Sequence, residues 1–302
     1  MSINQNFNKV IVPPIKIQGI KSKLIPFINS SVNWKHNQGT WIEPFLGSGS
    51  VLFNIQPSKA IVGDSNPHLI NFYKDLQSNK ITPAMIQTFL FNEGAKLKAS
   101  DGAYYYEVRE RFNSSPNSLD FLFLNRSCFN GMIRFNKKGY FNVPFCKKPD
   151  RFRQAYITKI VNQTKKVKQL IQNNDWTFIN TDWEDTISNA SHNDFIYLDP
   201  PYIGRSTDYF NNWTVNEAMK MAQIVQKSKA GWALSMWKSN KYRCNNYINY
   251  WDAYEANINH FYHLGSSEKN RNEVNEVLLI KYGYEQHEFD KITENLQLKF
   301  KI

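Results

Sequence analysis

The chain has 302 residues, of which 41% are hydrophobic; this length and composition predict a folded protein with a large core and exclude a mainly disordered chain. No apolar run reaches the ~18 residues that cross a membrane, and the polar segment 1–9 lacks the apolar core of a signal peptide. The formal net charge of +11 and the 15% aromatic content favour a polyanionic partner such as a nucleic acid.

The first elements along the chain alternate between strands and helices. Residues 40–45 predict a strand, and two glycines behind it predict a tight turn that leads into a helix. A second strand is predicted over 60–64, ending on an acid, and a helix over 66–76. The order of strand, glycine turn, helix, strand and acid is typical of the first half of a nucleotide-binding doubly wound fold.

This alternation lapses between residues 78 and 155. The segment combines apolar helical patterns with one short stretch that resembles a hairpin around an Asn-Lys-Lys-Gly turn. Helices are predicted at 83–96, 103–112 and 120–126, and the hairpin at 132–143. We therefore expect a smaller, mostly helical insertion that carries a β-hairpin.

The alternation resumes in the last part of the chain. Helices are predicted at 155–172 and 215–227, and strands at 176–180, 195–198, 231–236 and 276–282. The whole pattern predicts an α/β protein with a Rossmann-like doubly wound sheet. Its catalytic domain would be discontinuous, over 1–77 and 156–284, with the insertion at 78–155 and a charged tail at 285–302.

A four-residue motif follows the buried strand at 195–198 and carries the strongest chemical signal. Asp199 and the carbonyl of Pro200 can both accept hydrogen bonds from a planar amino group, and Pro201 makes the turn rigid. Tyr202 can stack on a flat ring. The motif stands where ligands bind in an open α/β sheet, so it indicates methylation of an amino group on a heteroaromatic ring.

A glycine-rich loop after the first strand is the predicted cofactor site. It contains Glu43, Pro44, Phe45, Gly47 and Gly49. The spacing matches neither the dinucleotide fingerprint nor a phosphate-binding P-loop, so the loop fits a nucleoside-like ligand without a pyrophosphate. The alternative is an ordinary turn between a strand and a helix.

Two acids at the ends of neighbouring strands are further candidates for this site. Asp64 could accept hydrogen bonds from both ribose hydroxyls, although it could equally cap the helix that starts at Asn66. Asp182 could accept from an adenine amino group, although a lone acid there is more often a loop residue.

Taken in order, several segments resemble the DNA adenine methyltransferases of the Dam type, the alpha-ordered D12 class. The central stretch, from Asn125 to Asn136 and on to Phe145, is the most specific of these segments. The others are 16–21, 43–50, 64–73, 199–202 and 275–280.

This resemblance implies S-adenosylmethionine as the cofactor. It places Ile17, Lys21, Asp64 and Asp199 where the family holds that cofactor, and Asp182 near the cofactor's adenine. Ile17 stands where the family has a tryptophan, which weakens stacking on the cofactor.

The resemblance also implies double-stranded DNA as the partner. The predicted DNA-contacting residues are Lys16, Phe129, Asn130, Met132, Arg134, Lys137, Lys138 and Pro144. The target adenine would be flipped out of the duplex, with Phe129 filling the gap and Asn130 pairing with the orphaned base. Arg134 is predicted to read a guanine edge, with a phosphate contact as its alternative, and the turn lysines Lys137 and Lys138 to meet phosphates.

Other expectations concern the setting of the protein. Its cysteines, Cys128, Cys146 and Cys244, are far apart, which predicts free thiols in the cytoplasm and no metal site. We expect a monomer in solution, no membrane association, and a restriction–modification system with a partner endonuclease that acts on the same site.

The sequence is also compatible with three alternative activities. A methyltransferase for RNA or for a protein amide can share the four-residue motif, but it would lack the central segment. A cytosine amino methyltransferase usually has serine at the position of Asp199. The third alternative, a catalytically inactive DNA-binding regulator, is disfavoured by the intact motif at 199–202.

Overall fold

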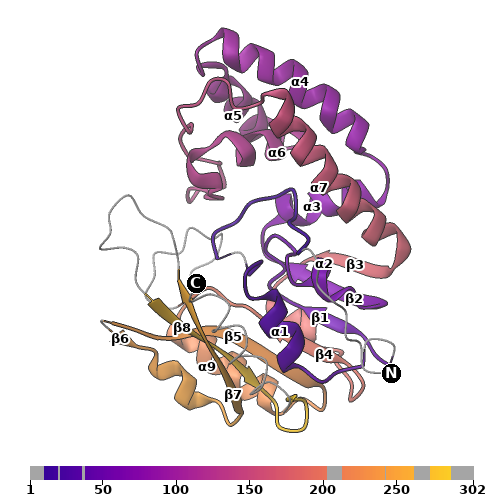
Figure 1. The fold of residues 1–302 in the computed structure, drawn as a ribbon, viewed down its shortest axis with the longest axis vertical. Coiled ribbons are helices and arrows are strands. Elements are labelled where there is room, and N and C mark those ends of the chain that lie inside the picture. Colours follow the sequence, from indigo (N-terminus) through magenta and orange to yellow (C-terminus); the bar gives the residue numbers. More distant parts are fainter. Residues whose placement is uncertain are drawn as a thin grey trace, which may run out of the picture.

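The structure is a computed structural model that describes residues 10–19, 21–35, 38–202, 213–241, 243–261 and 273–286 (Figure 1). In chain order its elements are α1 (Ile25–Ser31), β1 (Trp41–Glu43), α2 (Leu52–Ile55), β2 (Lys59–Asp64), α3 (Pro67–Gln77), α4 (Pro83–Ala99), α5 (Tyr104–Ser114), α6 (Ser118–Ser127), η1 (Phe129–Gly131), α7 (Gln154–Asn173), β3 (Asp175–Asn180), α8 (Trp183–Ile187), β4 (Phe195–Leu198), α9 (Val215–Gln226), β5 (Gly231–Asn240), β6 (Arg243–Cys244), η2 (Asn246–Tyr250), β7 (Tyr254–Phe261) and β8 (Glu273–Ile280).

A single mixed sheet forms the lower part of the molecule in Figure 1. Its strand order is β3-β2-β1-β4-β5-β8-β7, and β6 pairs with β5 at one end. The pairs from β3 to β5 are parallel, whereas β8 and β7 run antiparallel to their neighbours. This topology confirms the predicted Rossmann-like α/β fold.

The centre of the sheet explains where a ligand can bind. The chain runs outward from β1 through β2 to β3, and then returns to the other side of β1 as β4. This reversal is the topological switch point, where the strand ends leave a crevice. All four residues of β4 are buried, as expected for a central parallel strand with both faces covered. Trp41 on β1 stacks on Phe195 and Tyr197 of β4 with ring centroids 5.4 and 5.7 Å apart.

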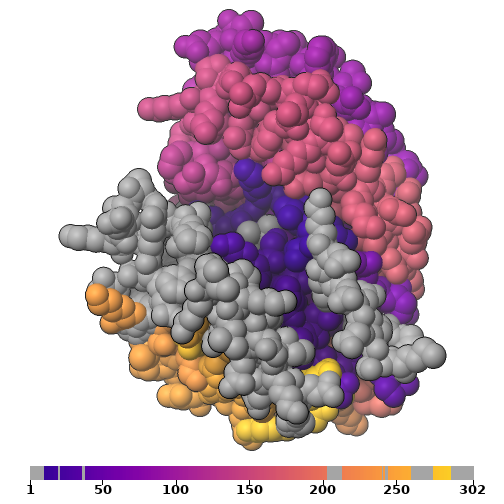
Figure 2. All heavy atoms as spheres, in the orientation of Figure 1, coloured from indigo at the N-terminus to yellow at the C-terminus, as the bar shows by residue number. Residues whose placement is uncertain are grey.

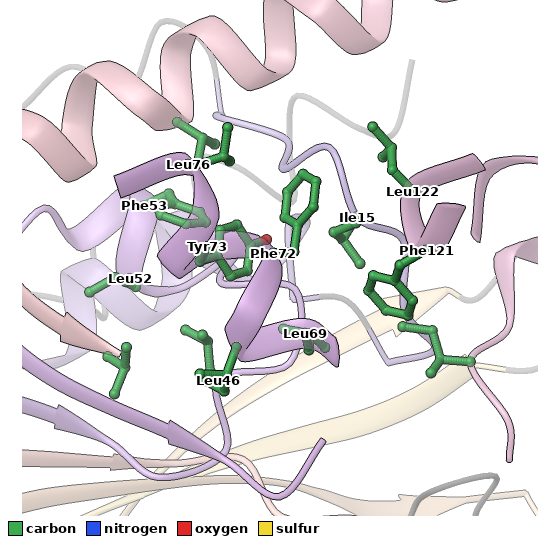
Figure 3. Close-up of a cluster of buried hydrophobic side chains, with 14 of the residues drawn as sticks. Ile15, Leu46, Leu52, Phe53, Leu69, Phe72, Tyr73, Leu76, Phe121 and Leu122 are labelled. Atoms are coloured by element: carbon green, nitrogen blue, oxygen red, sulfur yellow. The ribbon is translucent and has the colours of Figure 1, made fainter. Parts of the chain in front are cut away.

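Two apolar layers cover the two faces of the sheet. One cluster combines α8 and α9 with one face of the strands and includes Trp183, Met221 and Trp232. The larger cluster lies on the other face and continues through α3 into the helices α4–α7. Figure 3 shows Tyr73 of α3 between Phe53 and Phe72, with Phe121 on the far side of Leu69; the Tyr73 ring centroid lies 5.3 Å from that of Phe53 and 5.4 Å from that of Phe72.

The helix α3 begins where its sequence predicts. Asn66 caps it, with its side chain accepting from the amides of His68 and Leu69 at 3.0 and 3.4 Å, and Pro67 occupies the first turn. The apolar side chains of α3 recur at helical spacing on one face, and that face joins the sheet to the helical segment.

The helices α4–α7 form the upper part of the molecule in Figure 1. The helix α4 crosses α7 closely, because a Cβ on Gly94 would lie 2.6 Å from the Cβ of Phe152 just before α7. The helix α7 also packs on α3 and β3, so it straddles the boundary that we predicted near residue 155. The division into domains at 78 and 155 stays a prediction.

The predicted β-hairpin over 132–143 is shorter than expected. One isolated bridge joins Phe135 to Phe141, and the turn is present, with the amide of Gly139 donating to the carbonyl of Asn136 at 2.9 Å. The Asn113 side chain bonds both the amide and the carbonyl of Phe141, at 2.8 and 3.2 Å, and so covers the outer edge of the hairpin. Further along, Pro144 has no N–H with which to continue a ladder.

Two other features complete the described fold. Residues 284–286 pair with the end of α1, where the amide of Gln286 donates to the carbonyl of Ser31 at 3.0 Å. The rest of the predicted tail lies outside the described residues. None of the described helices combines the length and the hydropathy needed to cross a membrane.

Candidate active site

A cavity of about 440 Å³ opens at the carboxyl ends of β1, β2 and β4, at the switch point of the sheet. This volume lies within the range of small-molecule sites, which is roughly 300–1,000 Å³. The lining residues include most of the predicted cofactor residues: Ile17, Lys21, Glu43, Pro44, Phe45, Gly47, Asp64, Asp182 and Asp199.

Gly49 is the predicted cofactor residue that lies outside the lining. Its backbone is left-handed, with φ of +74°, and a Cβ at this position would lie 2.4 Å from the ring of Phe53. Gly49 therefore allows the loop to pack tightly on α2. Gly47, with φ of +52°, does line the cavity, and a Cβ there would meet only the Ile17 side chain, at 3.8 Å.

The cavity is acidic, although the protein as a whole is basic. The described lining residues contain six carboxylates and one cation, Lys21. The acids are Glu43, Asp64, Asp182, Glu184, Asp199 and Glu217. A cleft lined by one sign of charge attracts the opposite sign, so the cavity suits a ligand that carries positive charge.

Glu43 lies at the end of β1 and is only 2% exposed. Its carboxylate accepts from the indole N–H of Trp41 at 3.1 Å. Burial raises the pKa of Glu43 to about 8, and the neighbouring charge of Asp199 acts in the same direction. A nearby cation would favour the ionised form of this carboxyl group.

Asp64, at the end of β2, connects two loops of the cavity. Its carboxylate accepts from the amide of Gly47 and from the amide of Asn66, both at 2.9 Å. Burial raises its pKa to about 6. The cap of α3 is Asn66, so the alternative role of Asp64 as that helix cap is wrong.

Asp182 has two structural roles in this region. It lines the cavity at an exposed position and caps α8, where its carboxylate accepts from the amide of Asp185 at 3.0 Å. On the same wall, the rings of Phe45 and Trp213 meet edge to face at 5.3 Å. An acid beside aromatic rings can accept from the amino group of a flat base while the rings contact its face.

The four-residue motif after β4 is held by a buried network of charges. The ammonium group of Lys21 lies 3.0 Å from the Asp199 carboxylate and donates to the Tyr202 hydroxyl at 2.6 Å. That hydroxyl donates to the Glu276 carboxylate at 3.1 Å. Lys21 and Glu276 are 3% and 1% exposed, whereas Asp199 is 22% exposed and reaches the cavity.

The network fixes how the motif can act. Burial raises the pKa of Asp199 above its ordinary value, while the charge of Lys21 opposes that shift. Lys21 lies 4.8 Å from the centre of the Tyr202 ring, so one face of this ring already contacts a cation. The predicted stacking of a base on Tyr202 would use the other face.

Pro200 and Pro201 separate the cavity from a smaller recess of about 30 Å³. Pro201 and Trp213 line both spaces. The other walls of the recess are largely aromatic and include Tyr202, Trp237, Tyr247, Tyr250 and Trp251. The motif thus stands between an acidic cavity and an aromatic surface.

Sequence reasoning missed Glu276, which holds Tyr202 from the adjacent part of the sheet. The signal was available, since a charged residue stands before the apolar run Val277–Ile280 of a buried strand. A buried carboxylate needs a hydrogen-bond or ion-pair partner, so the position of Glu276 in a buried strand predicts such a partner.

The predicted DNA-contacting residues lie on and around η1 and the hairpin. Phe129 is 51% exposed, and Asn130 is exposed with a left-handed φ of +53°. The amide of Phe129 donates to the carbonyl of Pro144 at 2.8 Å, which ties η1 to the far side of the hairpin. Met132 is half-buried behind this turn.

The hairpin itself separates its basic residues. Arg134 is half-buried and donates from Nε to the Asn142 side chain at 2.7 Å and from Nη2 to the Asn142 carbonyl at 3.1 Å. Lys137 and Lys138 are exposed in the turn. Asn142, a second residue that sequence reasoning missed, therefore orients the Arg134 guanidinium.

Lys16, on the segment before α1, lies next to this surface. Its backbone amide and carbonyl both bond the side chain of Asn125 on α6 at 2.8 Å. Its side chain passes over Gly131, where a Cβ would lie 2.7 Å from the Lys16 Cδ. Lys16 therefore lies beside η1.

Comparison with known proteins gives a family match and several similar sequences. Residues 18–280 match the family model of the D12 class N6 adenine-specific DNA methyltransferases. The chain is 30% identical over 219 residues to the type II methyltransferase M1.LlaDCHI of Lactococcus lactis, covering 68% of this chain and 72% of that protein. It is 32% identical over 213 residues to a DNA adenine methylase of Vibrio cholerae, covering 66% and 71%. Similarity to the type II methyltransferase M.MjaIII of Methanocaldococcus jannaschii is 29% over 260 residues, covering 77% and 85%.

Proposed function

Because the chain belongs to the D12 class of N6 adenine-specific DNA methyltransferases, we propose that it methylates the exocyclic amino group of adenine in double-stranded DNA. S-adenosylmethionine would supply an electrophilic methyl group on a positively charged sulfur. The observation that carries this proposal is the Asp199 carboxylate, which is fixed by Lys21 and faces the acidic cavity.

The cavity fits this cofactor in size and in charge. S-adenosylmethionine carries a sulfonium and an ammonium group, and the cavity offers carboxylates with burial-raised pKa values, notably Glu43 and Asp64. Asp64 would accept from the ribose hydroxyls, and Gly47 leaves room for a close approach of the ligand. Asp182 and the wall of Phe45 and Trp213 would hold the adenine ring.

The residues of the motif would prepare the target amino group. That group is a poor nucleophile because its lone pair is conjugated with the purine ring. Asp199 and the Pro200 carbonyl would each accept a hydrogen bond from one N–H of this amino group. These two hydrogen bonds would localise electron density on the nitrogen. The nitrogen becomes acidic as it is alkylated, so Asp199 needs no unusual basicity, and correct positioning contributes most of the rate.

The target base must leave the duplex, because its amino group is buried in a base pair. Flipping costs a few kcal/mol, and contacts that fill the gap offset part of this cost. Phe129 presents an exposed ring on η1, next to the exposed Asn130. We propose that Phe129 stacks in the gap and that Asn130 bonds the orphaned base.

The setting of the enzyme follows from its relatives and its chemistry. Two of the relatives are named as type II methyltransferases, and by analogy we propose that this chain modifies DNA in a restriction–modification system with a partner endonuclease. It would act as a monomer in the cytoplasm.

The test is direct. The purified full-length chain is incubated with S-adenosylmethionine and genomic DNA, and the product is analysed for N6-methyladenine by mass spectrometry and by sequencing that detects modified bases. We expect methyladenine at one short recognition sequence, and none with Asp199→Ala. Methylation of RNA, of protein or of cytosine with unmodified adenine would contradict the proposal, as would an inert wild-type protein that binds cofactor and DNA.

A further inference from the structure

Three cations gather around one tyrosine at the junction between the N-terminal segment and the helices. The guanidinium groups of Arg151 and Arg126 lie 4.3 and 4.9 Å from the centre of the Tyr156 ring, and the Lys16 ammonium lies 6.0 Å from it. Arg151 also donates to the Tyr156 hydroxyl at 2.7 Å. In Figure 2 the N-terminal segment, in indigo, lies in a recess below the magenta and pink helices.

This three-cation cluster has no acidic partner among the described residues. None of its members forms an ion pair, and the charged neighbours that influence Lys16 and Arg126 are the other cations and Tyr156. Burial lowers the pKa of Lys16 and that of Arg126, and the charge of Arg151 lowers both further. The cluster therefore concentrates like charges in a partly desolvated place.

Another arginine of the same helical segment shows the contrast. Arg111 lies within 2.9 Å of Glu93 and also pairs with Asp120, and both acids are buried. The fold thus pairs this guanidinium, whose side chain is 43% exposed, with two buried carboxylates. The cations around Tyr156 lack that neutralisation.

The hydrogen bonds of the cluster leave one donor unused. The two guanidiniums are oriented by backbone carbonyls: Arg126 donates to Pro14 at 3.0 Å, and Arg151 donates to Arg126 at 2.9 Å. The Nε of Arg126 is buried and has no hydrogen-bond partner, and Arg126 is only 2% exposed. An unpaired buried donor on a charged group is costly, so the hydrogen bonds within the protein do not fully satisfy this cluster.

We propose that Lys16, Arg126 and Arg151 form a binding site for one backbone phosphate of the DNA, a role that rests on the proposed function. The half-buried Lys16 and Arg151 make the cluster accessible, and Lys16 lies directly beside η1, which carries the predicted gap-filling Phe129. A phosphate offers several acceptor oxygens and a negative charge, so it can accept from the half-buried Lys16 and Arg151 and offset the repulsion among the three cations. Such a contact fixes the register of the duplex without reading sequence.

The first test compares two matched variants in duplex binding at several salt concentrations. Arg151→Gln should weaken binding roughly tenfold and lower the slope of log affinity against log salt by about one unit. Arg153→Gln is the control, since Arg153 is exposed and pairs with Asp150. Lys16→Gln is a second test variant, because the contacts that hold its segment come from its backbone. Cofactor affinity and thermal stability establish that each variant is folded.

The second test locates the phosphate. Single phosphates of the duplex are replaced in turn by neutral methylphosphonate, and binding is measured for the wild type and for Arg151→Gln. We expect one position at which the replacement weakens the wild type about tenfold and leaves the variant unchanged. Equal salt slopes for Arg151→Gln, Arg153→Gln and the wild type, or equal losses at every position in both proteins, would overturn the site.

Three further outcomes separate the proposals. If the wild type neither binds nor methylates duplex DNA, the proposed function fails. If it does both and no methylphosphonate position depends on Arg151, only the phosphate site fails. Inorganic phosphate could also stabilise the wild type but not Arg151→Gln, while no methylphosphonate position depends on Arg151. That result would assign the cluster to a free anion and overturn the DNA contact.

Discussion

The acidic cavity and the three-cation cluster carry opposite charges within one protein. In the cavity six carboxylates face one lysine, whereas around Tyr156 three cations face no described acid. Burial disfavours the charged form in both regions: it raises the pKa of Glu43 and Asp64 and lowers that of Lys16 and Arg126. In the function that we propose, each region binds a ligand of opposite charge: a cationic cofactor in the first and a polyanion in the second.

The largest expected effect tests the residue that lies closest to the chemistry. Asp199→Ala should reduce turnover at least a hundredfold, about 2.7 kcal/mol, because the amino group loses an acceptor and Lys21 loses its ion pair. Turnover is measured with saturating cofactor and DNA, and circular dichroism checks the fold. Retention of more than about a tenth of wild-type turnover, a loss below ~1.4 kcal/mol, would remove Asp199 from the catalytic role.

The next largest effect should concern cofactor binding in the acidic cavity. Asp64→Ala should weaken cofactor binding by about 1.5–3 kcal/mol, since hydrogen bonds to a charged group are lost, while DNA affinity changes little. Calorimetry with cofactor and anisotropy with a labelled duplex give the two affinities. Asp150→Ala is the control, because Asp150 lies on the surface and pairs with Arg153. Unchanged cofactor affinity would leave Asp64 as a loop-connecting residue only.

Among the basic residues of the hairpin, Arg134 should affect the selectivity for sequence, whereas the two turn lysines should affect the affinity for all DNA. Arg134→Ala should cost about 1–3 kcal/mol on the cognate site and relax selectivity at one base pair, and Asn142→Ala should reproduce part of this loss by releasing the guanidinium. Lys137→Ala and Lys138→Ala should weaken all sequences alike and each lower the salt slope by about one unit.

The measurement is methylation across single-base variants of the site at two salt concentrations. A uniform loss from Arg134→Ala, with an unchanged selectivity profile, would make Arg134 a backbone contact.

The last expected effect concerns pH. A carboxyl group whose pKa is raised on folding contributes stability that is complete below its unfolded pKa and is lost as the pH rises through its folded pKa. Glu43 moves from 4.5 to about 8 and Asp64 from 3.8 to about 6, so the unfolding free energy of the ligand-free protein should fall between roughly pH 4 and 8. Cofactor affinity should rise over the upper part of this range, by up to about tenfold per pH unit, because a cation binds the ionised carboxylates.

Glu43→Gln is the matched variant for this experiment. It should flatten the upper part of both curves, between about pH 6 and 8, while leaving the lower part that Asp64 causes. Thermal unfolding and calorimetry at several pH values give the two curves. Parallel curves for the wild type and Glu43→Gln would show that Glu43 does not titrate in this range.

Much of the sheet could be predicted because its central strands are short apolar runs that end at a proline, a glycine or an acid. The strands at 40–45, 60–64 and 195–198 correspond to β1, β2 and β4. The strand β7 was missed because it lies at the edge of the sheet and mixes polar with apolar residues, so its sequence lacks a buried run.

The site was only partly predictable for a related reason. Motifs of neighbouring residues predict local groups such as Asp199 and Tyr202, and they lead to the cavity. The Lys16, Arg126, Arg151 and Tyr156 cluster brings together three distant parts of the chain, and no spacing rule connects them. The orientation of Arg134 by Asn142 likewise depends on the bend of the hairpin.

The apolar cluster that continues from the sheet through α3 into α4–α7 has a consequence for protein engineering. Since these helices share a core with the sheet, we expect them to melt together with it in a single calorimetric transition, rather than as an independent module. A chimera that exchanges residues 78–155 for those of a relative, to alter the recognised sequence, would also have to exchange the matching face of α3, including Leu69 and Phe72.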